Sequence, residues 1–499
     1  MKIDNLLKKP NWYRRASDNR NTKPMVAPAT YPTLAPLTFD FGVQEVITQS
    51  QMLDELDPNS HLIYNVYHRS NRPQYRYNAE TKNNELVGFE PVERVAIAFQ
   101  AAIRRHKVTH TFGNPVWFGN ESGDGSADEM VKFKSHWNVS GMSNALIEFG
   151  NAAFGVAEGA IYCYRDGDEI KYQVFSYEKG DLIAPCRDPK TGKDAVVRTF
   201  LVEDIQCVEI YGSEDIELWA KATDSVEIAA PDRFRQIWGD ILGETSEDGY
   251  ILISRATHGL KECPVAYHRE PGPCWSNAQS NIEAIEKLLS DLMENGKYYN
   301  FQIMFLSGGA ISLPNANFPG KVMGSKSENG DAKILAPADA SNTFSISLEQ
   351  EFKAMCNAVN AVFIDYKELK GQNDSGAYLR NLYFPETQWS MDAYARLHPF
   401  FKKLFSIFKG YVGIIEKKSV EFQKLKFSYM LTPFVPQNEA EEIQNINSSV
   451  AAGTMSIETA CEEHPQANPQ EFQRLEAQAK REQPPTETEE IEVVENNPV

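Results

Sequence analysis

The sequence predicts an α+β fold in which helices and strands occupy separate stretches of the chain. Apolar residues recur at helical spacing over much of residues 37–150. The period then changes, and residues 159–221 are rich in aromatic and β-branched residues separated by turn signals. Two amphipathic helices follow within residues 280–363, joined by a segment too rich in glycine and proline to be helical. Such segregated runs of helices and strands are typical of an α+β protein.

Composition favours a globular protein with a sizeable core. The 499 residues are 42% hydrophobic and 24% charged, which is enough for two or three domains or one large subunit. No run of about 18 apolar residues occurs, so we expect no membrane span. The N-terminal sequence MKIDNLLKKPNWYRR is basic but lacks the apolar stretch of a signal peptide, so we expect assembly in a cytoplasm.

Signals for a cofactor or a catalytic site are poor. The seven cysteines are scattered and odd in number, which argues against a disulfide framework and against a zinc site. His106 and His110 have i, i+4 spacing, but no HExxH glutamate and no third ligand accompany them, so we interpret them as structural. No G-x-S-x-G motif, Walker loop or G-x-G-x-x-G before a helix occurs. We therefore expect a protein that is not an enzyme and has no cofactor.

The N-terminal part is predicted to be an arm followed by helices. Residues 1–36 are polar and contain several prolines, which indicates an extended arm. One helix is predicted around Val95–His106, where the cationic end suits the helix dipole. Another is predicted over Met142–Phe154.

An antiparallel β-rich layer is predicted next. In AIYCYRDGDEIKYQVFSY, the pair Asp166-Gly167 is a hairpin turn signal between two aromatic and β-branched runs. Residues 188–194 (DPKTGKD) mark a second turn, and VVRTFLV and CVEIY supply further strands. Two more strands are expected at 249–255 and 263–267.

Two amphipathic helices are the strongest pattern in the sequence. The first is predicted over 280–305, roughly 38 Å long at a rise of about 1.5 Å per residue, and the second over 342–363. The first helix has an apolar stripe of Ile282, Ile285, Leu288, Leu289 and Leu292, and another face of Glu283, Glu286, Ser290 and Glu294. The second has a stripe of Leu348, Phe352, Met355, Val359 and Val362, with Glu349, Lys353, Asn357 and Asn360 away from it.

The connecting residues 306–341 hold eight glycines and prolines in all, a density that excludes a helix. Short strands are expected around Ala310–Leu313 and Lys333–Leu335. A compact β-containing tip on two helical struts fits this segment better than a long loop.

Further helices and a strand are predicted after residue 363. LKGQNDSGAYLR is a break before a new helix, and Pro385 and Pro399 should start, kink or divide helices. Residues 420–431 are predicted to be a strand. A cluster of short helices then follows, with Gly453 as a stop and Ser456 as a cap. After Gln483 the chain has five Glu, several Pro and no Lys or Arg, which predicts a disordered tail.

The order of these parts resembles the portal proteins of long-tailed bacteriophages. RRHKVTHTFGNPVWFG (104–119) is similar to the family's helix followed by a G-x-P-V strand, and residues 150–188 are similar to its wing strands. CPVAYHRE and the helix after it resemble the I-P-V-I strand and the first stem helix. NDSGAYLR (373–380) resembles the S-G-x-A-L segment, and residues 445–482 resemble the crown pattern with its G-x-x-S-x-E-T-A.

The resemblance covers roughly residues 85–482 and has two departures. Residues 381–400, with two prolines, interrupt what the family usually makes one long kinked helix. The first 84 residues match nothing in the family's pattern.

The resemblance implies a portal-type subunit with a wing, a stem, a clip and a crown, assembled as a homo-dodecameric ring. On that mapping the parts are an arm (1–36), the wing (37–279), stem helix 1 (280–305), the clip (306–341), stem helix 2 (342–363), the tunnel loop and wing helices (364–436), the crown (437–482) and a disordered acidic tail (483–499). The ring would sit at one capsid vertex of the virion, after assembly in the host cytoplasm. Double-stranded DNA would pass through it during packaging and ejection.

The same resemblance implies partners and site residues. The clip would dock terminase and later the head-completion or adaptor proteins, through Lys321, Lys326 and Lys333, and major capsid and scaffolding proteins would surround the ring. The tunnel loop would include Gly371, Gln372, Asn373, Asp374 and Ser375, and Gln372, Asn373 and Asp374 would touch DNA weakly while the flanking glycines let the loop change shape. The stem would face the channel with Glu283, Glu286, Glu294 and Glu349. With a net charge of -19 the chain should not grip DNA, and carboxylates in a channel would repel phosphates.

Other interpretations stay open at the level of sequence. Glutamates on an amphipathic helix are usually a solvated surface, a Gln-Asn-Asp-Ser stretch is usually a turn, and lysines in a Gly-rich loop usually serve solubility. A hydrolytic enzyme with an Asp/Glu pair would instead need a deep pocket inside one subunit. A capsid or baseplate protein would have a different symmetry.

Overall fold

The computed structural model describes residues 13–15, 45–78, 80–81, 83–121, 127–188, 191–202, 205–222, 234–235, 237–300, 303–306, 310–312, 324–325, 332–335, 341–363, 380–435, 439–464 and 471–482. Within these ranges the chain forms two compact units, one from Met1–Phe363 with Pro385–Phe434 and one from Ile364–Phe384 with Val435–Val499. No helix in the described ranges is long and apolar enough to cross a membrane.

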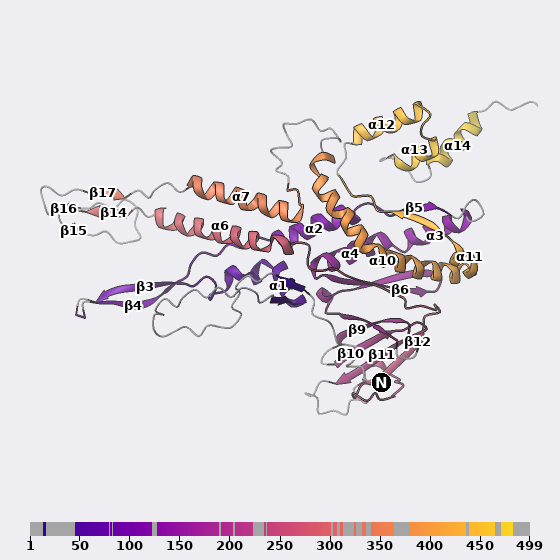
Figure 1. Cartoon of the computed structure of the whole chain (residues 1–499), viewed down its shortest axis with the longest axis horizontal. Helices are drawn as coiled ribbons and strands as arrows, with labels where there is room; N and C mark the ends of the chain where they lie inside the picture. Colours follow the sequence, from indigo (N-terminus) through magenta and orange to yellow (C-terminus); the bar gives the residue numbers. More distant parts are fainter. Residues whose placement is uncertain are drawn as a thin grey trace, which may run out of the picture. The chain divides into compact units, whose positions relative to one another are not determined.

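Four helices enclose the largest apolar core of the first unit (Figure 1). They are α2 (Phe99–Phe112), α3 (Ala127–Val139), α4 (Met142–Gly155) and α10 (Phe384–Ile415). Rings from different helices stack inside this core, as Phe149 does on Phe400 with centroids 4.0 Å apart. The helix predicted over Met142–Phe154 is confirmed. The helix predicted around Val95–His106 is confirmed only in part, because α2 begins at Phe99 and continues to Phe112, so Arg104, Arg105 and His106 lie inside it rather than at its end.

Smaller elements close the edges of this core. They are β5 (Trp117–Asn120), α11 (Ser419–Lys424) and β18 (Phe427–Met430), and β5 pairs with β18. The prediction of one strand over 420–431 is therefore wrong for its first half. Phe422 is fully buried from a helical turn, so packing selects a helix there before the strand begins. The helix α1 (Gln49–Leu56) packs instead in a small separate cluster, where Met52 is buried with Val156 and Ala157.

The helix α10 continues through Pro399. Pro385 lies at its start, as predicted, but Pro399 lies inside it and does not divide it. A proline within a helix costs about 3 kcal/mol or more, because it removes one hydrogen bond and clashes with the preceding turn. Burial of Phe400, Phe401 and Leu404 just beyond it offsets that cost. Figure 1 shows α10 changing direction along its length, the usual effect of an internal proline.

The β-rich part contains two antiparallel sheets, with strand orders β13-β6-β7 and β12-β11-β10-β9-β8. The strands are β6 (Glu158–Asp166), β7 (Glu169–Phe175), β8 (Leu182–Arg187), β9 (Asp194–Val202), β10 (Ile205–Tyr211), β11 (Asp215–Ala222), β12 (Ile251–Thr257) and β13 (Val265–Arg269). The predicted hairpin at Asp166-Gly167 is confirmed, with Asp166 opposite Glu169 and Gly167 at φ +65°. The turn at 188–194 is confirmed between β8 and β9.

Two β elements near the N-terminus were not predicted. β3 (Arg72–Asn78) and β4 (Asn83–Glu90) form a hairpin inside the stretch that was expected to be mainly helical. β1 (Tyr13–Arg15) pairs with β2 (Glu45–Ile47). The sequence RPQYRYN alternates weakly, because charged and polar residues interrupt its aromatic residues, so the strand period is hidden.

The two amphipathic helices are present with small strands between them. α6 (Gln279–Asn300) and α7 (Ser341–Val359) match the two predicted helices, and β14 (Ile303–Leu306), β15 (Ala310–Ser312), β16 (Gly324–Ser325) and β17 (Ala332–Leu335) lie between them. The short strands predicted at Ala310–Leu313 and Lys333–Leu335 are confirmed. The prediction that the first helix runs to residue 305 is wrong, because β14 pairs with β17. The periodicity of a short apolar run such as Ile303–Leu306 is compatible with a helix or with a strand. Here the run is a strand because it pairs with β17.

The second unit contains three described helices, α12 (Glu439–Ala451), α13 (Ile457–Glu463) and α14 (Glu471–Glu482). The predicted cap and stop between them are confirmed. Ser456 accepts a hydrogen bond from the Thr459 amide at 3.1 Å, and Gly453 adopts φ +69° at the end of α12.

Candidate functional site

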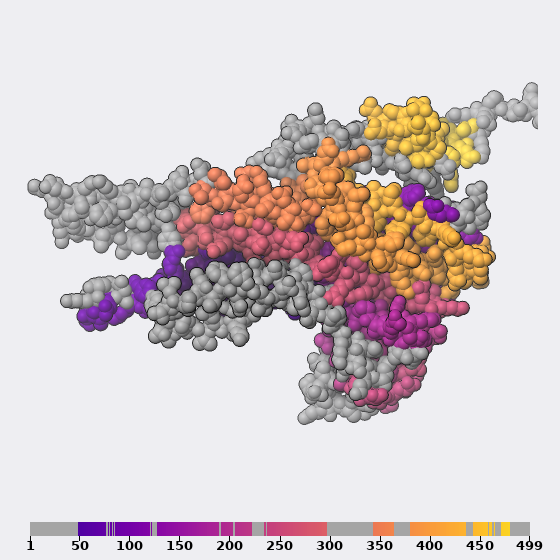
Figure 2. All heavy atoms as spheres, viewed as in Figure 1, coloured from indigo at the N-terminus to yellow at the C-terminus, as the bar shows by residue number. Residues whose placement is uncertain are grey.

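The helices α6 and α7 pack along their predicted apolar stripes. Ile282 and Ile285 of α6 are buried against Met355 and Val359 of α7, with Leu289, Leu348 and Phe352 partly buried beside them. Figure 2 shows the two helices lying against each other. Since the apolar stripe of each helix packs against the other helix, any further contact of the pair must use the remaining faces of α6 and α7.

One face of α6 is covered by an extended segment of the same chain. The amides of Glu93, Val95 and Ile97 donate hydrogen bonds to three side chains of α6 spaced four residues apart. These are Glu294 (2.8 Å), Ser290 (2.9 Å) and Glu286 (3.0 Å). Two residues of extended chain span about 6.6 Å and four residues of helix span about 6 Å, so the two repeats stay in step.

Residues 61–72 add side-chain contacts to the same face. His61 Nδ1 lies 2.6 Å from Glu286 Oε1, with both side chains buried. Arg69 Nη1 lies 2.7 Å from Asp291 Oδ1, and Arg72 Nη2 lies 3.4 Å from Glu294 Oε1. Residues 61–72 and 93–97, on either side of the β3–β4 hairpin, therefore hold the chain against α6, and we call these two stretches the strap.

The strap corrects one expectation about the channel face. Glu286 and Glu294 were expected on a free polar face, but they are only 2% and 8% exposed because the strap covers them. Their spacing with Ser290 is the signal that was missed. Because Glu286, Ser290 and Glu294 are spaced four residues apart, their side chains place hydrogen-bond acceptors on one face of α6 at nearly the same interval as alternate amides of an extended chain. A helix face that contacts only solvent does not need this spacing.

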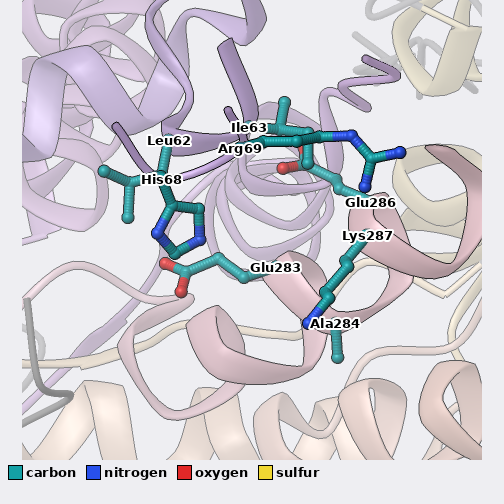
Figure 3. A pocket seen from close by; sticks show the side chains of 8 residues that line it. All are labelled: Leu62, Ile63, His68, Arg69, Glu283, Ala284, Glu286 and Lys287. Atoms are coloured by element: carbon teal, nitrogen blue, oxygen red, sulfur yellow. The ribbon is translucent and has the colours of Figure 1, made fainter. Parts of the chain in front are cut away.

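Glu283 lines a cavity of about 230 Å³ between the strap and α6. The cavity is lined by Leu62, Ile63, His68, Arg69, Glu283, Ala284, Glu286 and Lys287. Figure 3 shows the imidazole of His68 beside the carboxylate of Glu283. Glu283 accepts a hydrogen bond from Gln279 Nε2 at 2.9 Å, and Glu286 accepts from His61 and Ile97. These two carboxylates therefore have structural partners and are not a free acid–base pair of the kind hydrolysis requires.

The outward face of α7 is open. The side chain of Glu349 is 62% exposed, and its carboxylate lies 2.6 Å from Lys353 Nζ at i, i+4 spacing. The hydrogen bond from Lys353 lowers the pKa of Glu349. Gln350 and Asn357 are exposed on the same side. Of the four predicted stem glutamates, only Glu349 has an exposed side chain. The neighbouring Lys353 balances its negative charge.

A buried charged cluster joins the end of α7 to the start of α10. Lys107 is fully buried and donates from Nζ to the Asn360 carbonyl at 2.7 Å. Glu386, 1% exposed, accepts from the Val362 amide at 2.7 Å. Burial lowers the pKa of Lys107 to about 8, although the charge of Glu386 opposes the shift. The cluster therefore links residues on both sides of the segment between α7 and α10, with Asn360 and Val362 before it and Glu386 after it.

His106 and His110 belong to this cluster. Their Nδ1 atoms lie 3.6 Å and 3.8 Å from the carboxylate oxygens of Glu386. Despite burial, which opposes ionisation, the neighbouring His106 side chain and the hydrogen bond from the Val362 amide keep the pKa of Glu386 below its ordinary value. Within the ranges described above, no group of three His, Cys, Asp or Glu side chains is arranged to hold a metal ion.

The other predicted site residues lie outside the part of the chain whose side chains are described. The predicted tunnel-loop residues 371–375 and the clip residues Lys321 and Lys326 fall outside the described ranges. Lys333 belongs to β17, which pairs with β14, and only its backbone is described.

Comparison with known families gives one match, which covers most of the chain. A family model described as phage portal protein, SPP1 Gp6-like, matches residues 67–485. No curated protein matches the chain.

Proposed function

The chain belongs to the family of SPP1 Gp6-like phage portal proteins, and from this premise we propose that it assembles as a dodecameric ring at one capsid vertex. Proteins of this family are structural rather than enzymatic. In the proposed ring, α6 and α7 of each copy form the stem, and double-stranded DNA passes along the axis during packaging and ejection. The observation that carries this proposal is the paired α6 and α7, whose apolar stripes face each other while one face of α7 stays polar and open.

The chemistry of the open α7 face suits a surface past which DNA slides. Binding of DNA strengthens with each phosphate that Lys or Arg neutralises, so a conduit must not offer a ring of unpaired cations. On α7 the one exposed lysine near Glu349 is already paired with it. The neighbouring Gln350 and Asn357 are neutral and polar. We therefore assign the channel-facing role to the α7 face around Glu349, rather than to the strapped face of α6.

The remaining roles in the proposal follow family resemblance. The segment with Gly371, Gln372, Asn373, Asp374 and Ser375 is the proposed tunnel loop. The clip, with Lys321, Lys326 and Lys333, is the proposed dock for terminase and then for head-completion or adaptor proteins. Capsid and scaffolding proteins are the proposed neighbours of the ring in the virion. The cluster of Lys107 and Glu386 supports the loop assignment, since its hydrogen bonds hold Asn360 and Val362, just before that segment, to α2 and to the start of α10.

Native mass spectrometry of the purified full chain tests the ring. We expect a discrete species at about twelve times the 56.3 kDa chain mass, accompanied by annular particles in negative stain. A chain that remains monomeric at every concentration, and that gives no annular particles, contradicts the proposal.

A further inference from the structure

His61 lies in a buried position between α1 and α6. It is 6% exposed and directly follows the short helical turn Pro58–Ser60. Its Nδ1 atom lies 2.6 Å from Glu286 Oε1 of α6, and its Nε2 atom lies 3.0 Å from the backbone carbonyl oxygen of Glu55 in α1. Both ring nitrogens are therefore within hydrogen-bond distance of an oxygen, and His61 joins the two helices.

These two contacts need two protons. A carbonyl oxygen only accepts, so the contact with Glu55 requires a proton on Nε2. An ionised carboxylate also only accepts, so the contact with Glu286 requires a second proton on the Nδ1 side. A neutral imidazole beside an ionised Glu286 supplies one proton for the two contacts. One nitrogen lone pair then faces an oxygen lone pair in a buried site, where an unsatisfied polar group costs its full desolvation free energy.

The charges around His61 favour its protonated form. Burial disfavours a charged imidazole, but the hydrogen bond and the charge of Glu286, helped by Glu55, outweigh burial and raise the pKa of His61. Asp57, in the turn before His61, adds a further negative charge within electrostatic reach of the ring. The geometry and the charges thus agree that the folded chain holds both protons at His61.

A second histidine lies on the other side of Glu286. The cavity between the strap and α6 brings His68 together with the cations Arg69 and Lys287 (Figure 3). His68 is exposed, and an imidazole can change its charge near neutral pH. An experiment on the proton at this place must therefore separate the two histidines.

The two stretches of the strap are tied to each other. Arg69 donates from Nε to the Glu93 carbonyl oxygen at 3.0 Å, and Arg94 donates from Nη2 to the Arg69 carbonyl oxygen at 2.7 Å. Because these bonds join residues 61–72 to residues 93–97, one stretch cannot leave α6 without disturbing the other. The β3–β4 hairpin lies between the two stretches in the chain, so it depends on both.

Glu286 holds both stretches through one oxygen, because its Oε1 atom contacts His61 and also accepts from the Ile97 amide at 3.0 Å. We propose that His61 is a proton-dependent latch, which keeps the strap and the β3–β4 hairpin against α6 only while each of its two ring contacts contains a proton. The strap is fastened at a pH below the folded pKa of His61. It opens locally as the pH rises through that pKa, while the core of the unit stays folded.

Hydrogen exchange of the purified full chain between pH 6 and pH 9 tests the latch. We expect the protection factor of residues 93–97 to fall at least about five-fold over this range, the effect of losing one buried hydrogen bond. Residues of α4, in the core, should stay at least about ten-fold better protected than the strap at pH 9. Constant protection of the strap overturns the proposal. Equal protection of α4 and the strap also overturns it, because the strap would then open only when the whole unit unfolds.

Two variants identify the histidine that acts. His61→Gln removes the titrating group, so we expect lower strap protection at pH 6 and no further fall up to pH 9. His68→Gln is the matched control on the other side of Glu286, and it should keep the wild-type fall. A fall of wild-type size in His61→Gln, or its loss in His68→Gln, overturns the latch.

Glu286→Gln tests the count of protons in the folded state. The new amide group can donate to Nδ1 of a neutral His61, while its oxygen still accepts from the Ile97 amide. A neutral imidazole then satisfies both ring contacts, so we expect strap protection that stays constant between pH 6 and pH 9. A fall of wild-type size in Glu286→Gln overturns the proposal.

Discussion

His61 fastens the strap to α6 through a buried contact with Glu286. Burial works to lower the pKa of His61, but the hydrogen bond and the charge of Glu286 outweigh it and hold the pKa above its ordinary value. The folded state then binds the proton more tightly than the unfolded state. The stabilisation is complete below the ordinary pKa and is lost as the pH rises through the folded pKa.

This linkage predicts a pH-dependent cost for His61→Asn. We expect the substitution to lower the free energy of unfolding by about 1–3 kcal/mol near pH 5, and by less near pH 9. Urea unfolding at a series of pH values measures the difference. His398→Asn is the control, because the exposed His398 contacts the Tyr429 hydroxyl rather than a carboxylate. A cost for His61→Asn that stays constant across the series contradicts the role of Glu286.

Lys107 has the opposite linkage. Burial holds its pKa at about 8, below the ordinary value of 10.5, so the unfolded state binds the proton more tightly between those two values. We expect the wild type to gain unfolding free energy relative to Lys107→Met as the pH rises from about 8 to about 10.5. Lys134→Met, at an exposed position of α3, should show no such trend against the wild type. Parallel curves for wild type and Lys107→Met would refute the assignment.

At the scale of elements, α2 and α4 approach closely because Gly150 has no side chain. A Cβ placed there would lie 2.6 Å and 2.7 Å from two ring carbons of Phe112, which is itself packed in the core. We expect Gly150→Ala to lower the unfolding free energy by about 1–3 kcal/mol through overpacking. Gly296→Ala is the control within α6. Nothing lies within 4 Å of its Cβ, so we expect a gain of about 0.5–1 kcal/mol.

Thermal unfolding followed by circular dichroism measures both glycine variants. If Gly150→Ala is as stable as the wild type, Phe112 has room to move and the close contact of α2 and α4 does not need a glycine.

The elements differ in how far the sequence could predict them. α6 and α7 were predictable because their apolar residues repeat at helical spacing over several turns, and the β6–β7 hairpin because Asp-Gly separates two strongly β-forming runs. The hairpin β3–β4 was not predicted, because its bulge at Val87 breaks the alternation that identifies a strand. The end of α6 was misplaced because the choice between helix and strand at Ile303–Leu306 depends on β17, some thirty residues away.

The candidate site was predictable only in part for a related reason. Periodicity identified the side of α6 that carries Glu286 and Glu294, but it could not say what covers that side. The strap comes from nearly 200 residues earlier in the chain, and its hydrogen bonds use backbone amides that carry no sequence signal. Glu349 lies away from the apolar stripe of α7, as periodicity predicts, and 62% of its side chain is exposed.

At the scale of the whole molecule, one charge on α7 is repeated in every copy of the proposed ring. Glu349→Lys would place an unpaired cation beside Lys353 in each copy, and phosphates would bind there. We expect rings to assemble normally and packaging in vitro to slow by about two-fold or more, with part of the rate restored by added salt. Glu214→Lys, in the turn between β10 and β11, is the control and should package at the wild-type rate.

Unchanged packaging by Glu349→Lys rings would show that this face of α7 does not line the DNA path. Charge reversal at Glu294 is not an equivalent test. Glu294 is buried under the strap, so its reversal should lower stability before it affects DNA.

A cryo-electron microscopy reconstruction of the purified full chain tests the central claim most directly. The account predicts a closed ring in which α6 and α7 of every copy surround an axial opening wide enough for double-stranded DNA, with the Glu349 face of α7 turned toward the axis. A reconstruction in which α6 and α7 lie inside a solid particle without an axial opening would contradict it.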